Sequence, residues 1–399
     1  MNKSKGRIAI LTGGGDVPGL NPAIRAITIR AVREGYEVLG LRRGWAGLVD
    51  LVRDPGADNS AQFVELTESV VNRAARTGGT FLHTSRTRPS HLPRAAVPPH
   101  LSATYSDEMN DLTPEVLKNL EFLEIDYLIP IGGDDTLSYG HRLHQEGVPV
   151  VAVPKTMDND VPGTDYCIGF STCVTRTIEL TRQLRTCAGS HERMLIIEVF
   201  GRYAGYTALI PTMAGAANRC VIPEHPFDIT RLAELLIADR RRNPSHYSVV
   251  LVSEGARMVD QEGMSFANQE TDQYGHKKLG GIGDLVAARL KEISPKFESH
   301  GRRINVVNQR LGYLVRGGAP DAFDSIVPMA FGNLALDLIL TKDTGQLVCL
   351  RNGIYDSVPI QAVVGTKKVI DVAKQYNVDR LRPIYESFRH QPLFAMTSR

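Results

Sequence analysis

The 399-residue sequence predicts an α/β fold with two lobes, in which parallel-rich sheets are flanked by helices. The first observation is that short apolar runs, typical of buried parallel strands, recur at 8–11, 38–41, 127–131, 148–153, 194–199 and 247–252. The second is that helical patterns separate or follow these runs, at 22–34, 171–185, 229–242, 282–293 and 321–340. Strands that alternate with helices form right-handed βαβ units, and a chain of this length can bury two cores.

Composition and charge exclude several classes of protein. A net charge of +2, with basic residues scattered along the chain, argues against nucleic-acid binding. No apolar run approaches the roughly 18 residues of a membrane span. The five cysteines show no C-x-x-C spacing, which favours reduced thiols over disulfides or a zinc site. We therefore expect a cytoplasmic protein that binds neither nucleic acid nor membranes.

The first strand leads into a glycine-rich turn that contains Gly13, Gly14 and Gly15. The next helix is expected to begin at Pro22, with Asn21 as its cap. Backbone amides of such a turn, together with a helix N-terminus, form a site for phosphate. The turn matches neither common phosphate-loop pattern, so a turn without a ligand is the alternative. Farther along, 85–111 contains four prolines and no periodicity, which predicts a long loop or a mobile lid.

Two polar turns, 132–136 and 154–160, each follow a predicted strand. Ligands bind at the carboxyl ends of strands in open α/β sheets, so the two turns suggest one site. Asp134 and Asp135 offer the oxygen ligands that Mg²⁺ prefers, and this ion usually takes one or two protein carboxylates beside substrate phosphates. Solvated turn aspartates are the alternative.

The turn 154–160 combines a cation, a hydroxyl group and two carboxylates, supplied by Lys155, Thr156, Asp158 and Asp160. Phosphoryl transfer to an alcohol needs a base for the hydroxyl proton, cations around the migrating group and a metal ion. Asp158 is the candidate base, and a helix cap or an Asx turn is the alternative for it.

Further cations lie downstream. Arg202 follows the strand 194–199, where it is placed to clamp the transferred group. Arg193 precedes the same strand and so lies at the opposite edge, which indicates either a contribution to a neighbouring subunit or a surface salt bridge. Tyr313 and Arg316 form another basic, hydroxyl-bearing turn suited to a sugar phosphate.

Seven segments in succession resemble the signature blocks of the phosphofructokinase family: 12–21, 131–136, 154–160, 163–170, 198–205, 253–255 and 312–320. They occur in the family's order and span about residues 7 to 340. The resemblance implies a large lobe, 1–169 with 317–370, that binds the phosphoryl donor. It also implies a smaller lobe, 170–316 with 371–399, that binds fructose 6-phosphate, with catalysis in the cleft between the lobes.

The resemblance also implies roles for single residues. Asp158 becomes the base for the sugar 1-hydroxyl, assisted by Thr156 and Asp160, and Asp134 serves Mg²⁺. The remaining residues implied to contact substrate are Gly14, Gly15, Arg202 with Phe200 and Gly201, Glu254 for sugar hydroxyls, and Tyr313 with Arg316 for the sugar phosphate. Arg193 reaches across from an adjacent subunit of a homo-oligomer. One departure is Val307, where many members carry an arginine that contacts a neighbour's sugar phosphate, and Arg310, Arg303 or Arg302 are candidates to replace it.

Asp135 and Lys155 bear on the identity of the donor. ATP-using bacterial relatives carry glycine at both positions, whereas the pyrophosphate-dependent branch carries this aspartate and this lysine. A carboxylate at Asp135 repeats the negative charge of the α-phosphate of ATP and occupies its space, so a nucleotide is repelled while pyrophosphate ends earlier. Lys155 places an ammonium beside the short donor.

We therefore expect a Mg²⁺-dependent, reversible enzyme of glycolysis and gluconeogenesis that converts pyrophosphate and fructose 6-phosphate into fructose 1,6-bisphosphate and orthophosphate. The alternatives are an ATP-dependent 6-phosphofructokinase and a regulatory, sugar-phosphate-binding subunit without catalysis.

Overall fold

The structure is a computed structural model of the chain and describes residues 4–74, 77–260, 263, 266–271, 277–279, 281–297, 304–386 and 388–389. The chain forms two compact units. Unit 1 comprises Met1–Thr156, Val161–Gly169 and Gly317–Lys367, and unit 2 comprises Met157–Asp160, Phe170–Arg316 and Lys368–Arg399. The expected lobe boundaries differ from this division at 157–160 and 368–370, which belong to unit 2.

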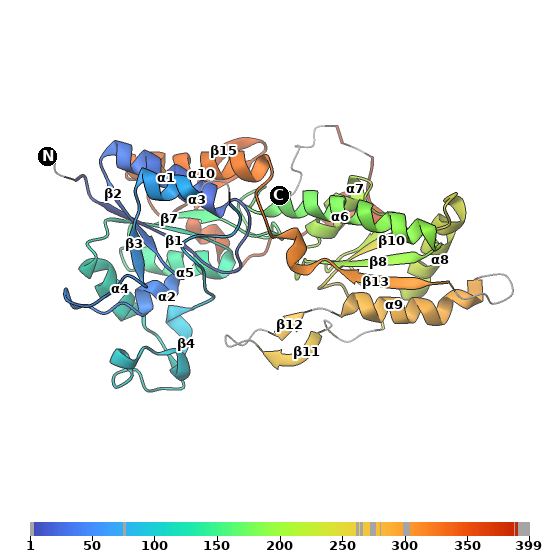
Figure 1. Ribbon diagram of the computed structural model, residues 1–399, viewed down its shortest axis with the longest axis horizontal. Helices are drawn as coiled ribbons and strands as arrows, with labels where there is room; N and C mark the ends of the chain where they lie inside the picture. The colour runs from blue at the N-terminus through green and yellow to red at the C-terminus, as the bar shows by residue number, and fades with distance from the viewer. Residues whose placement is uncertain are drawn as a thin grey trace. The chain divides into compact units, whose positions relative to one another are not determined.

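Unit 1 is built on a seven-stranded sheet with the order β15-β14-β7-β6-β1-β2-β3 (Figure 1). Its strands are β1 (Arg7–Thr12), β2 (Glu37–Leu41), β3 (Phe63–Glu65), β6 (Tyr127–Gly132), β7 (Val151–Pro154), β14 (Gln346–Arg351) and β15 (Ile354–Pro359). The five central strands are parallel, and β3 and β15 run antiparallel at the two edges. The predicted strands at 8–11, 38–41 and 127–131 are confirmed, and β7 covers the second half of the run at 148–153.

Helices cover both faces of this sheet (Figure 1). One face carries α1 (Leu20–Glu34), α3 (Glu68–Ala74) and α10 (Phe323–Leu340), and the other carries α2 (Trp45–Val49), α4 (Thr113–Phe122) and α5 (Asp134–Gln145). Helix α1 packs closely on α10 because Gly332 has no side chain, and a Cβ there would lie 3.0 Å from Cβ of Ala26. The α/β class predicted from periodicity is confirmed.

The segment 85–111, predicted to be a long loop or a mobile lid, contains short pieces of regular structure. It contains the short turns η1 (Pro89–His91), η2 (Arg94–Ala96) and η3 (Pro99–Leu101), and the two-stranded ladder of β4 (Leu92–Pro93) and β5 (Met109–Asn110). Leu92 and Leu101 are buried in the hydrophobic core beside α2 and α4. Apolar side chains spaced irregularly between prolines thus anchor a segment that has no periodicity.

Unit 2 contains a four-stranded parallel sheet with the order β13-β8-β10-β9. Its strands are β8 (Met194–Val199), β9 (Arg219–Val221), β10 (Ser248–Ser253) and β13 (Val306–Arg310). Helices α6 (Phe170–Ser190) and α7 (Tyr206–Met213) lie on one face, and α8 (Ile229–Arg242) and α9 (Ile282–Ile293) on the other (Figure 1). Smaller pairs are β11 (Phe266–Thr271) with β12 (Lys277–Leu279), and β16 (Tyr376–Asn377) with β17 (Arg382–Pro383).

Helix α10 is long and apolar enough to cross a membrane by length and composition alone, with a hydropathy of 1.5 over its 18 residues. Half of it is buried within unit 1, where it packs against α1. Core helices of soluble proteins share this composition, so α10 is weak evidence for a membrane span.

A buried ion pair ties α8 to the edge of the unit 2 sheet and gives the first prediction. Arg219 on β9 binds both carboxylate oxygens of Asp239 at 2.7 and 2.8 Å, and both side chains are at most 10% exposed. Asp239→Ala leaves the guanidinium buried without its counter-charge, so we expect the free energy of unfolding to fall by about 3–5 kcal/mol in urea titrations followed by circular dichroism.

The matched control is Glu234→Ala on the same helix, whose pair with Arg231 is nearly half exposed. This variant should lower the free energy of unfolding by at most about 1 kcal/mol. Equal losses in the two variants would contradict the prediction.

Candidate functional site

The glycine-rich turn of unit 1 lies at the carboxyl end of β1. Helix α1 begins at Leu20, after Gly19 in the left-handed conformation with a φ of 105°. The prediction that Asn21 caps this helix is wrong, because the buried Asn21 side chain donates to Thr77 Oγ1 at 2.9 Å and accepts from the amide of Phe81. Asn21 therefore fixes the neighbouring segment on the turn rather than the helix end.

Lys155, at the end of β7, is bound to the glycine turn. Its Nζ donates to the carbonyl oxygens of Gly13 and Gly15, both at 2.7 Å, and the residue is only 3% exposed. A buried ammonium needs such partners, because its loss of hydration is otherwise uncompensated. The turn has a matching shape, since Gly14 has a φ of 78° and a Cβ there would lie 3.3 Å from Lys155 Nζ.

Two amides of the turn already donate within unit 1. Gly13 N–H donates to Ile131 O at 3.0 Å, and Gly14 N–H donates to Ser85 O at 2.8 Å. A phosphate contact through the Gly14 amide would therefore require this bond to open. The role of Gly14 and Gly15 in binding substrate stays a prediction.

Asp134 and Asp135 begin helix α5, where the sequence predicted only a turn. Negative charges in a first helical turn are stabilised by the helix dipole. Asp134 Oδ1 accepts the amide of Asp135 at 2.9 Å, and Asp135 Oδ1 lies 2.7 Å from Nη2 of Arg88. Asp134 is exposed and keeps carboxylate oxygens available, which fits a Mg²⁺ ion that takes one protein carboxylate and otherwise phosphate and water. Among the described residues no group of three or more His, Cys, Asp or Glu side chains is arranged to hold a metal ion.

Arg88 is the residue of this region that sequence analysis missed. It lies in the proline-rich segment 85–111, for which no regular structure was predicted, so nothing placed its guanidinium near α5. A basic residue before Pro89 was the available signal, and it is a weak one.

In unit 2, backbone hydrogen bonds link the carboxyl ends of three parallel strands, β8, β10 and β13, through the residues that follow β10 and β13. The amide of Glu254, after β10, donates to Val199 O at 2.9 Å, and Gly255 N–H donates to Gly201 O at 3.1 Å. The amide of Leu311, after β13, donates to Glu198 O at 3.1 Å. Phe200, Gly201, Arg202, Glu254 and Tyr313 thus occupy one edge of the sheet.

Gly201 is required by this arrangement. Its φ is 122°, and a Cβ there would lie 2.8 Å from Ala204 O and 3.2 Å from Ser253 Oγ. The aromatic rings of Phe200 and Tyr313 then meet edge to face with centroids 6.4 Å apart. The guanidinium of Arg316 lies 4.8 Å above the Tyr313 ring, which is 71% exposed, so a cation and a hydroxyl group face solvent together.

Asp158 and Asp160 belong to unit 2, although Lys155 and Thr156 of the same turn belong to unit 1. Between the two carboxylates, the buried Asn159 has a φ of 55°, a left-handed conformation that asparagine tolerates better than most residues. The segment is also held by Lys368, whose amide donates to Asp160 O at 3.3 Å.

Burial raises the pKa of Asp158 well above its ordinary value, and its Oδ1 is inaccessible to solvent although part of the residue is exposed. The negative charges of Asp160 and then Glu254 raise this pKa further. Arg202 opposes the rise through a hydrogen bond from its backbone N–H and through its positive charge. The structure therefore gathers Asp158, Asp160, Arg202 and Glu254 into one electrostatic cluster.

Arg310, at the end of β13, forms ion pairs with two carboxylates of unit 2. It pairs with Asp284, and its Nε lies 3.6 Å from Glu198 Oε1. Glu198 also accepts the amide of Gly283 at 2.8 Å, which anchors the start of α9. Val307 lies within β13, a strand that the sequence analysis did not predict, and Arg302 and Arg303 lie outside the described residues.

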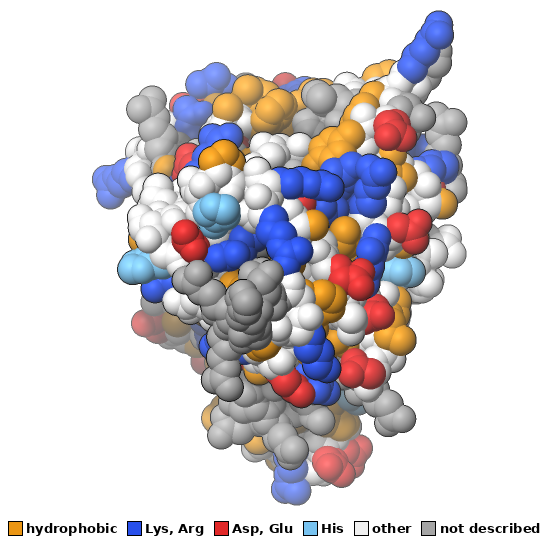
Figure 2. Space-filling model, turned by 90° about the vertical axis from the view of Figure 1, so that its right-hand side faces the viewer, with side chains coloured by type: hydrophobic (Ala, Val, Ile, Leu, Met, Phe, Trp, Pro, Cys, Tyr) orange, Lys and Arg blue, Asp and Glu red, His pale blue; other side chains and the backbone are white. Residues whose placement is uncertain are grey.

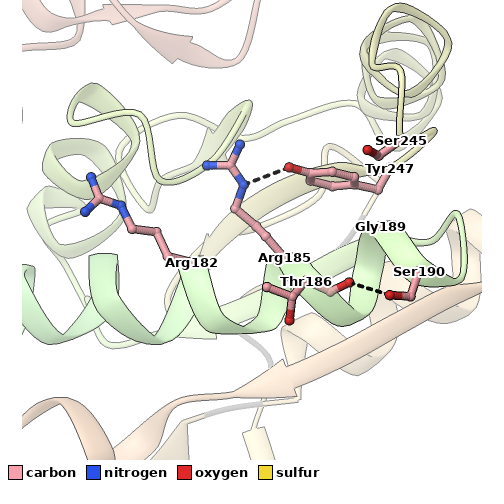
Figure 3. A pocket seen from close by; sticks show the side chains of 7 residues that line it. All are labelled: Arg182, Arg185, Thr186, Gly189, Ser190, Ser245 and Tyr247. Atoms are coloured by element: carbon pink, nitrogen blue, oxygen red, sulfur yellow. Dashed lines mark hydrogen bonds between the residues drawn. The ribbon is translucent and has the colours of Figure 1, made fainter.

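Arg193 lies at the amino end of β8, opposite the edge that carries Arg202. A cavity of about 630 Å³ lies near that same edge of unit 2 (Figure 3). It is lined by two guanidinium groups, several hydroxyl groups and a glycine: Arg182, Arg185, Thr186, Gly189, Ser190, Ser245 and Tyr247. Arg185 Nε donates to the Tyr247 hydroxyl at 3.1 Å. The surface view in Figure 2 also shows several Lys and Arg side chains. None of the predicted site residues lines this cavity.

The chain is similar to known proteins both in sequence and in fold. A family profile described as Phosphofructokinase matches residues 7–339. The pyrophosphate–fructose 6-phosphate 1-phosphotransferase of Streptomyces coelicolor is 37% identical over 92% of this chain and 97% of its own length. ATP-dependent 6-phosphofructokinase 3 of the same organism is 35% identical over the same shares.

Two solved structures have a similar fold. Pichia pastoris phosphofructokinase in the T-state has a TM-score of 0.71 and 26% identity, and the match covers 90% of this chain and 36% of that one. A pyrophosphate-dependent phosphofructokinase from Marinobacter aquaeolei has a TM-score of 0.73 and 18% identity, with coverage of 95% and 89%.

The cluster around Asp158 predicts how its carboxyl group titrates. Asp160→Asn removes the negative charge that raises the pKa of Asp158 most after burial, so we expect this pKa to fall toward its ordinary value, as followed by ¹³C NMR of carboxyl-labelled aspartate. Glu234→Gln serves as control, because this carboxylate is nearly half exposed and pairs with Arg231, and it should leave the titration unchanged. A pKa of Asp158 that stays the same in Asp160→Asn would show that the two carboxylates do not interact.

Proposed function

The chain belongs to the phosphofructokinase family, and we propose that it transfers the terminal phosphoryl group of pyrophosphate to the 1-hydroxyl of fructose 6-phosphate. The products are fructose 1,6-bisphosphate and orthophosphate. Relatives of nearly equal identity are named for pyrophosphate and for ATP, so overall similarity does not choose the donor. Our choice of pyrophosphate as the donor therefore rests on two side chains, those of Asp135 and Lys155.

The observation that carries the choice is the carboxylate of Asp135, held at the start of α5 by Arg88 at 2.7 Å. A fixed negative charge at this position repels the α-phosphate of ATP, whereas pyrophosphate is too short to meet it. Lys155, bound to the glycine turn, supports the same reading, because it adds a buried positive charge at the turn expected to bind the short donor.

In the proposed reaction, Asp158 takes the proton of the sugar 1-hydroxyl. The alkoxide oxygen forms a bond to the terminal phosphorus, the bond from that phosphorus to the bridging oxygen breaks, and orthophosphate leaves. A base is most effective when its pKa lies near the working pH, and burial with two neighbouring carboxylates moves Asp158 in that direction. Arg202, beside Asp158, would stabilise charge that develops on the migrating group.

Asp134 would hold Mg²⁺, which neutralises charge on phosphate oxygens when it is bound. We assign Glu254 to the sugar hydroxyls and Tyr313 with Arg316 to the 6-phosphate, since a hydroxyl group and a guanidinium suit a phosphate dianion. Arg193, at the opposite edge of the sheet, is assigned to the site of a neighbouring subunit in a homo-oligomer.

The exchange of one phosphoanhydride for one phosphate ester without a nucleotide makes the reaction freely reversible, so the enzyme can serve both glycolysis and gluconeogenesis. We place it in the cytoplasm, where phosphorylated sugars are used. An ATP-dependent enzyme is the second candidate, favoured by the 35% identity to the ATP-dependent relative. A subunit without catalysis is disfavoured because Asp134, Lys155, Asp158 and Arg202 are all present.

Donor choice is tested directly with purified enzyme, fructose 6-phosphate and Mg²⁺. We expect turnover with pyrophosphate and a kcat/KM for ATP at least about a hundredfold lower, since a like-charge clash costs several kcal/mol. Turnover with ATP and none with pyrophosphate would reverse the assignment.

Replacement of the base gives a separate test. Asp158→Asn should lower kcat by about 10²- to 10⁴-fold while fructose 6-phosphate still binds in calorimetry. Because burial raises the pKa of Asp158, kcat of the wild type should decline on acidification at a pH above the range of an ordinary aspartate. Unchanged kcat in Asp158→Asn would remove this residue from the mechanism.

A further inference from the structure

The ion pair of Arg88 and Asp135 joins two segments of unit 1 that sequence analysis did not connect. Arg88 Nη2 lies 2.7 Å from Asp135 Oδ1, and the two side chains are 42% and 60% exposed. An exposed pair of this kind contributes little to stability. The pair does fix the positions of the two charged groups relative to each other.

The backbone around Arg88 is anchored on both sides. Ser85 accepts the amide of Gly14 at 2.8 Å through its carbonyl oxygen, and its hydroxyl donates to Arg43 O at 2.7 Å. Pro89 is buried, and its carbonyl oxygen accepts the amide of Leu112 at 2.8 Å. Arg88 thus extends from a segment that contacts the glycine turn at one point and reaches the start of α5 at another.

The charged side chains at this edge of unit 1, Lys155, Asp134 and Arg88, differ in burial and in the partners that they can bind. Lys155 is buried and donates to the glycine turn, so its position is fixed by the backbone. Asp134 is exposed beside the helix start and suits a metal ion. Arg88 is a long, partly exposed cation whose guanidinium can bind a carboxylate or a phosphate with similar geometry.

We propose that Arg88 is a donor-specificity residue, which holds the Asp135 carboxylate in place against a nucleotide and supplies positive charge beside pyrophosphate. This inference rests on the proposed function. It also implies that Arg88 changes partner when Asp135 is removed. In Asp135→Gly the freed guanidinium would bind the additional phosphate of ATP, so the ATP activity gained in that variant depends on Arg88.

The experiment compares KM and kcat for pyrophosphate and for ATP in the wild type, Arg88→Gln, Asp135→Gly and the double variant. Arg88→Gln should raise KM for pyrophosphate by about tenfold, the loss of one charge-assisted hydrogen bond, with kcat changed less than about twofold. Arg88→Lys should recover most of the loss. Asp135→Gly should gain turnover with ATP, and the double variant should lose at least about tenfold of that gain in kcat/KM.

Arg142→Gln is the matched control, because Arg142 pairs with Glu146 at 2.8 Å near the other end of α5 with similar exposure. Its KM values should equal those of the wild type. A KM for pyrophosphate that is insensitive to Arg88→Gln, or equal ATP activity in Asp135→Gly and the double variant, would overturn the role of Arg88 alone. A wild type that uses ATP and not pyrophosphate would instead overturn the proposed function.

Discussion

The hydrogen bonds of the buried Lys155 ammonium to Gly13 and Gly15 hold unit 1 together at its functional edge. A charge that is 3% exposed is tolerable only where carbonyl oxygens replace water, so the glycine turn and the end of β7 must keep one geometry. Ser85, bonded to Gly14, then places the segment that carries Arg88. A single cation therefore determines the positions of three stretches of chain that are distant in sequence.

In unit 2, by contrast, the functional edge contains several carboxylates that lie close enough to affect the pKa of Asp158. Burial raises the pKa of Asp158 most, the charges of Asp160 and Glu254 raise it further, and Arg202 opposes this rise. Such a cluster costs folding free energy, since each carboxylate would be more stable alone in water. Backbone hydrogen bonds that clamp the ends of β8, β10 and β13 hold the strand-end members of the cluster in place.

Periodicity predicted the fold well because strands such as β1, β6 and β8 are almost wholly buried and therefore continuously apolar. It missed β13, whose second half is the polar Asn308, Gln309 and Arg310 at a sheet edge. The polar turns were found because they follow strands directly. Arg88 was not found, because its role depends on tertiary packing of an aperiodic segment, and Asn21 was misassigned because Gly19 starts the helix earlier.

The division of the chain between the units has a consequence for synthesis on the ribosome. The chain passes from one unit to the other after Thr156, Asp160, Gly169, Arg316 and Lys367. Strand β7 pairs with β14, so one side of β7 lacks its neighbour until Arg351 has been translated. A nascent protein of this design exposes an open strand edge from the completion of β7 until the synthesis of β14, and an unpaired strand edge is prone to aggregation during that interval.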